Sequence, residues 1–152
     1  MTDSLERAAI YLAGYAFSLF GGGKGARSVT ATIPVGGHYS AELLGLVEAT
    51  IYTTAWVVGK DLFIPVWLAL KVSTHWGKSD VKETRPIFNR WLIGTGVSLA
   101  FGVSAGMFIQ DATEHRWWAA LGPVIAVGVG TLLLIWRGRI LERRDRQGPQ
   151  PP

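Results

Sequence analysis

Apolar residues in this chain are gathered into long blocks, and most charged residues stand between the blocks. An amphipathic helix of a soluble protein instead shows apolar positions with a period of about 3.6 residues, relieved by polar ones. A helix that crosses a bilayer needs about 20 apolar residues, because the hydrocarbon core is about 30 Å thick. The pattern therefore predicts an all-α integral membrane protein, a four-span helical bundle. The predicted spans cover about residues 6–22, 43–70, 87–109 and 117–136.

The first two blocks are less regular than the last two. The first is short and ends in glycines at 21–23, after which no helix is expected before Ser40. If this block lies in the interface, three spans and an interfacial N-terminal helix remain. The second block contains Lys60, Asp61 and Pro65, and its part after Asp61 is too short to span alone. We interpret it as one long helix kinked near Pro65, because proline removes an amide donor and crowds an earlier carbonyl.

The distribution of basic residues predicts the orientation. Residues 1–136 form one predicted transmembrane domain, and 137–152 form a basic cytoplasmic tail. Most basic residues flank the second connection or follow the last span, namely Lys71, Lys78, Lys82, Arg85, Arg90, Arg137, Arg139, Arg143, Arg144 and Arg146. The other connections carry Lys24, Arg27 and Arg116. Because lysine and arginine accumulate in cytoplasmic loops, both termini are expected on the cytoplasmic side of an inner membrane.

Composition supports this interpretation and excludes several kinds of chemistry. Nineteen glycines and seven tryptophans suit lipid-embedded helices and their interfaces. The absence of cysteine excludes disulfides, thiolate metal sites and cysteine nucleophiles. His38, His75 and His115 lie in separate segments without the spacing of a metal site. No nucleophile or phosphate-loop motif is present, and no aromatic stacking platform accompanies the positive charge. We expect no enzyme activity, no metal, no cofactor and no nucleic-acid partner.

Small residues recur at every fourth position of the predicted spans and so line one face of each helix. The two most regular series are Gly94, Ser98, Gly102 and Gly106 in the third span, and Gly122, Ala126 and Gly130 in the fourth. Such faces let helix backbones approach closely, either within one chain or between subunits. The leading hypothesis is therefore a non-enzymatic membrane protein that assembles through these faces. It would be a holin-like homo-oligomer or an accessory subunit of a membrane complex.

Ionisable residues within the second span suggest an alternative. Glu48, Lys60 and Asp61 are expected at membrane depth, where charge is costly and often marks an ion or proton pathway. A small channel or transporter that uses these three residues is the alternative to assembly. Basic residues beside the spans are candidates for contact with an anion or with anionic lipid headgroups, namely Lys24, Arg27, Arg143 and Arg144.

Overall fold

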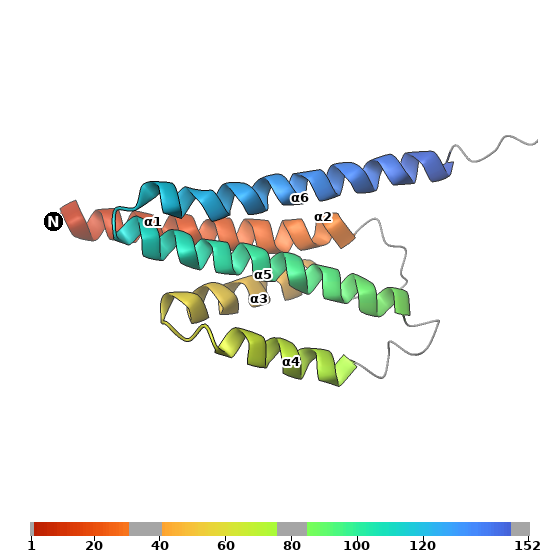
Figure 1. The fold of residues 1–152 in the computed structure, drawn as a ribbon, viewed down its shortest axis with the longest axis horizontal. Helices are drawn as coiled ribbons and strands as arrows, with labels where there is room; N and C mark the ends of the chain where they lie inside the picture. Colours follow the sequence, from red (N-terminus) through yellow and green to blue (C-terminus); the bar gives the residue numbers. More distant parts are fainter. Residues whose placement is uncertain (1, 31–40, 76–84, 147–152) are drawn as a thin grey trace, which may run out of the picture.

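The structure is a computed structural model that describes residues 2–30, 41–75 and 85–146. Every regular element in these ranges is a helix, so the predicted all-α class is confirmed for them (Figure 1). The helices are α1 (Thr2–Phe20), η1 (Gly21–Gly25), α2 (Ala26–Thr30), α3 (Ala41–Val57), α4 (Phe63–His75), α5 (Arg85–Thr113) and α6 (Trp117–Arg146). The first three follow one another without a break and form one rod.

This rod and the helices α3, α4, α5 and α6, each of which we also call a rod, lie side by side and alternate in direction (Figure 1). The rod of α1, η1 and α2 runs from the end marked N, α3 returns, α4 runs out again, α5 returns and α6 runs out last. Helix α5 contacts α1, α3 and α6 and is the centre of the bundle. The first residue of α1 and the last residue of α6 consequently lie at opposite ends of the molecule.

The interpretation of the second block as one long kinked helix is wrong. Helix α3 ends at Val57, and a turn reverses the chain before α4 begins at Phe63. The turn depends on Gly59, whose φ of 68° lies in the left-handed region that favours glycine. Pro65 causes no kink because it stands in the first turn of α4, where backbone N–H groups have no helical partner to lose.

The expectation that no helix follows the glycine run is wrong for residues 21–30. Helicity continues through η1, a short π-helical stretch, and through α2. A β-carbon on Gly22 would lie 2.5 Å from that of Ala49, and one on Gly21 would lie 2.0 Å from the Phe101 ring. The glycines therefore serve close packing of the first rod against α3 and α5, and this packing outweighs their low helix propensity.

The interior of the bundle is rich in polar groups. Buried apolar residues form three small clusters, and the buried polar residues are Ser18, Thr30, Glu48, Thr53, Thr95, Ser98 and Ser104. Many large apolar side chains point outward instead, above all on α6. An apolar exterior around a hydrogen-bonded interior is the arrangement that a lipid environment favours.

Two helices of the described residues are long and apolar enough to cross a membrane, within Phe88–Thr113 and Trp117–Ile140. They coincide with the third and fourth predicted spans. Half of the most apolar stretch of α5 is buried inside the bundle, against 6% of that of α6. Helix α6 also continues ten residues into the predicted tail, to Arg146.

Candidate functional site

A buried ion pair joins α3 to α4. Glu48 lies midway along α3 with its side chain 2% exposed, and the ammonium group of Lys71 on α4, whose side chain is 10% exposed, contacts its carboxylate. The Lys71 ammonium also donates a hydrogen bond of 2.7 Å to the Thr95 hydroxyl of α5. It lies 4.6 Å from the centroid of the Trp91 ring, also on α5. Three helices therefore meet at one charged site.

This pair is energetically important because both charges are withdrawn from water. Desolvation of two ions costs several kcal/mol each, and only close pairing with further hydrogen bonds compensates for it. Lys71 has such support from Thr95 and from the face of Trp91, a cation–π contact. We infer that the site holds α4 against the rest of the bundle, because separating the two helices would leave an uncompensated buried charge.

Two further polar groups lie one helical turn from the pair. Tyr52 follows Glu48 by four residues on α3, and Trp67 precedes Lys71 by four residues on α4, so each shares the face of its charged neighbour. Both side chains belong to one packed cluster between the two helices. The Tyr52 hydroxyl and the Trp67 indole N–H are buried near each other, and neither makes a hydrogen bond of good geometry with a described residue.

The structure does not bring the three predicted pathway residues together. Glu48 is buried, whereas Lys60 and Asp61 are exposed in the turn at the far end of α3. The sequence reasoning missed Lys71 and assigned it to the flank of a connection. The available signal was a single basic residue in the otherwise apolar segment Phe63–Ser73, downstream of an acid in the middle of the preceding helix.

The small residues of α5 pack inside the chain. A β-carbon on Gly102 would lie 2.7 Å from that of Tyr52 and 2.8 Å from the Ala49 carbonyl oxygen. One on Gly106 would lie 2.6 Å from the β-carbon of Trp56. Ser98 is fully buried, while a β-carbon on Gly94 would make only an ordinary van der Waals contact with Thr30 of α2, at 3.6 Å.

The small residues of α6 have a different environment. A β-carbon on Gly122 or Gly130 would meet no atom of the described residues within 4 Å, and Ala126 between them is exposed. The same spacing that packs α5 against α3 thus faces outward on α6.

Hydroxyl groups add direct links between the helices. Ser18 of α1 and Thr53 of α3 place their hydroxyl oxygens 2.7 Å apart in the interior. The Thr53 hydroxyl donates to the Gly102 carbonyl of α5 at 3.1 Å. At the far end of α3, the Trp56 indole donates to the Gln110 side-chain oxygen at 3.0 Å. These bonds fix the register of α3, and with it the depth of Glu48.

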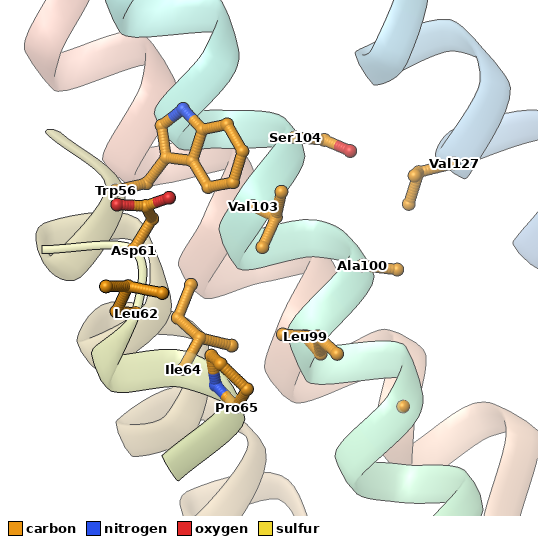
Figure 2. A pocket seen from close by; sticks show the side chains of 11 residues that line it. Trp56, Asp61, Leu62, Ile64, Pro65, Leu99, Ala100, Val103, Ser104 and Val127 are labelled. Atoms are coloured by element: carbon orange, nitrogen blue, oxygen red, sulfur yellow. The ribbon is translucent and has the colours of Figure 1, made fainter. Parts of the chain in front are cut away.

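An open apolar groove runs between α4, α5 and α6 (Figure 2). Its volume is about 500 Å³, and its floor is formed by a second series of small residues on α5, namely Gly96, Ala100 and Ser104. Figure 2 shows the Asp61 carboxylate beside the Trp56 ring at one side and Val127 of α6 facing α5 at the other. A groove with such walls suits an apolar chain or helix rather than a polar substrate.

The candidate headgroup contacts lie at one end of the bundle. Lys24 is exposed and sits 5.1 Å from the centroid of the Phe20 ring, and Arg27 bonds Glu42 at 2.8 Å. Both lie near the end at which α6 finishes (Figure 1). Arg143 and Arg144 stand on the last turns of α6, although their side chains fall outside the described part.

No group of three or more histidine, aspartate or glutamate residues within the described ranges is arranged to hold a metal ion. His115, in the turn before α6, lies 3.8 Å from Glu6, while His38 lies outside the described residues. No known family, curated protein or solved structure matches this chain.

Proposed function

We propose that this chain is a non-enzymatic, multi-pass inner-membrane protein that assembles with another membrane helix through α6. The observation that carries the proposal is the open small-residue face of α6, Gly122, Ala126 and Gly130, on a long apolar helix that is barely covered by its own chain. Contact with lipid would account for the exposed leucines of α6. It does not account for a series of small residues, which permits the backbone of a second helix to approach.

We also propose a topology that differs from the expected one. Under this topology all five rods cross the bilayer, and the turn at Lys60 and the turn at Arg116 lie outside. The supporting observation is that the end where α6 finishes gathers most basic residues of the described helices, namely Lys24, Arg27, Arg85, Arg90, Arg137, Arg139, Arg143, Arg144 and Arg146. That end would be cytoplasmic, and the N-terminus would lie on the opposite side.

The absence of cysteine makes this topology simple to test. Single cysteines replacing Ser4, Glu114 or Arg139 are exposed to an impermeant thiol reagent on intact cells or right-side-out vesicles. We expect labelling at Ser4 and Glu114, and labelling at Arg139 after permeabilisation alone. Equal labelling of Ser4 and Arg139 from one side would contradict five crossings.

Of the two forms of assembly, the accessory-subunit form is favoured over a holin-like pore. Between Trp117 and Trp136, the exposed face of α6 carries no charged side chain, and its large exposed residues are apolar. A water-filled pore walled by this face would have to hydrate apolar surface. A dry helix contact requires no such polar lining.

The deciding experiment is the mass of the complex in lipid nanodiscs, made from native membrane extract and from purified chain. We expect Gly122→Leu and Ala126→Leu to release the partner or second copy. Leucine has higher helix propensity than glycine, so loss of Gly122 would not unravel α6. Leu132→Phe, which enlarges an exposed residue away from the small-residue face, is the matched control. Unchanged masses in all variants would refute assembly through this face.

A further inference from the structure

The buried polar groups between α3 and α4 form two layers, and both contain atoms that make no hydrogen bond of good geometry with the described residues. In one layer, Glu48 and Lys71 are paired, with Thr95 and Trp91 in support of Lys71, while the Glu48 carboxylate oxygen beside Lys71 makes no such bond. In the next, the Tyr52 hydroxyl and the Trp67 indole N–H lie near each other without one. Unsatisfied buried polar groups are costly and rare in folded proteins, and a bound water is their usual explanation.

The donors and acceptors of the two layers suit one water molecule. The Trp67 indole can only donate, the Tyr52 hydroxyl can donate or accept, and an ionised Glu48 can only accept. A water that accepts from Trp67 and Tyr52 keeps both of its own hydrogens for donation, one of them toward the carboxylate. Such a water would connect the Glu48 carboxylate to the Tyr52 hydroxyl and the Trp67 indole.

We propose that the α3–α4 interface is a proton-exchange site in which Glu48 takes up and releases the proton, opposite Lys71, beside a water held by Tyr52 and Trp67. The site is independent of the assembly proposed for α6, because none of these residues belongs to that helix. Its ligand is a proton, and its chemistry is that of a carboxylate confined with an ammonium group.

The contacts of Lys71 allow Glu48 to change charge. In the exchange step, a hydronium ion gives one proton to the carboxylate, which leaves water and a neutral carboxylic acid. The site then carries the single positive charge of Lys71, which retains the Thr95 hydroxyl and the Trp91 ring. Release to water reverses the step. A lysine without these two contacts would be stranded in the interior by the same event.

Several other charged residues stand on the elements around the site. On the first rod, Lys24 stands over Phe20 and Arg27 bonds Glu42 of α3, both at the surface. On α5, the half-buried Arg90 precedes Trp91. Lys60 and Asp61 lie at the far end of α3, on the turn to α4. The charge of Glu48 is therefore coupled most directly to Lys71.

The site is nearer to one end of the bundle. Lys71 stands four residues before the end of α4, about 6 Å along the helix axis from the last residue, His75. The Lys71 side chain retains slight exposure while that of Glu48 is nearly closed off. Proton exchange is therefore expected from the basic end of the molecule, past Lys71.

Infrared difference spectroscopy of the full chain in nanodiscs tests the proposal, because a carboxylic acid and a carboxylate absorb at separate frequencies. Carbon-13 labelling of glutamate assigns the signal to that residue type, and circular dichroism monitors the fold. Lowering the pH should produce a buried glutamic-acid band that is lost in Glu48→Gln and kept in the control Glu42→Gln. Tyr52→Phe should shift the frequency or midpoint of the band, because it removes one anchor of the water.

Each outcome decides the matter. If wild-type protein shows no such band while its fold persists, Glu48 stays ionised and the pair is structural only, which overturns the proposal. A band that survives Glu48→Gln overturns it as well. If Glu48→Gln does not fold, Glu48→Gln/Lys71→Met removes both charges and must lose the band. A band unaffected by Tyr52→Phe would refute the bridging water.

Discussion

Removing one charge of the buried pair should destabilise the fold more than removing both. Lys71→Met keeps an unbranched side chain of similar length but takes away the ammonium group, so Glu48, 2% exposed, loses its counter-charge. Breaking a buried pair in this way typically costs about 3–5 kcal/mol, whereas replacing both partners is often nearly neutral. We therefore expect about 3–5 kcal/mol for Lys71→Met and clearly less for Glu48→Gln/Lys71→Met.

Glu48→Gln should cost less than Lys71→Met. After loss of the carboxylate, Lys71 keeps its hydrogen bond to Thr95 and its contact with Trp91. A hydrogen bond to a charged group is worth about 1.5–3 kcal/mol, so the two single variants should differ by roughly that amount. The cost of Lys71→Met should also shrink as the pH falls, because a protonated Glu48 needs no counter-charge.

The assay is reversible unfolding in mixed micelles, followed by tryptophan fluorescence and circular dichroism for the wild type, both single variants and the double variant. The double-mutant cycle isolates the coupling between the two side chains. Since about 1.4 kcal/mol is a factor of ten, the expected loss for Lys71→Met changes the unfolding equilibrium by about 100-fold or more. A Lys71→Met effect below about 1 kcal/mol that simply adds to that of Glu48→Gln in the double variant would refute the inference that the pair holds α4 in place.

Three further predictions follow from individual positions. Gly102→Leu should lower the free energy of unfolding by at least about 1–3 kcal/mol, because its side chain would overlap Tyr52 and the α3 backbone. Gly130→Leu should leave monomer stability unchanged, because no described residue lies near that position. Equal effects of the two variants in the same unfolding assay would contradict this packing. Gly59→Ala should cost about 1–2 kcal/mol through its positive φ, and a neutral result would argue against the α3–α4 turn. Pro65→Ala should change thermal stability little, while a large change would restore the interpretation of Pro65 as a kink.

The sequence predicted the helices better than the way they connect. Long apolar blocks sufficed for α5 and α6, because length and composition alone define such helices. The break within the second block was not predicted, because the 13 residues of α4 fall below the usual span length and so favour one continuous helix in spite of the turn signal at Gly59. The helical glycines at 21–25 could not be predicted from propensity, since their reason is contact with Ala49, Leu46 and Phe101 of other helices.

Of the two charged residues of the candidate site, one could be predicted from the sequence. Glu48 stood out as an acid in the middle of an apolar segment, and that signal requires no tertiary structure. Its partner depends on the reversal of the chain at Gly59, which brings α4 back beside α3 and places Lys71 against the carboxylate. A single continuous helix would have kept the two charges far apart. The error in connection therefore caused the error in the site.

The α3–α4 hairpin also has a consequence for how the chain would enter a membrane. A charged residue at the centre of an inserting helix costs about 2.5–3.5 kcal/mol, so α3 with Glu48 and the short α4 with Lys71 are each poor candidates to partition into lipid alone. Paired, their charges cancel before either meets hydrocarbon. Under the proposed topology, we expect α3 to stay at the translocation channel until α4 has been synthesised. The two helices would then enter the lipid together.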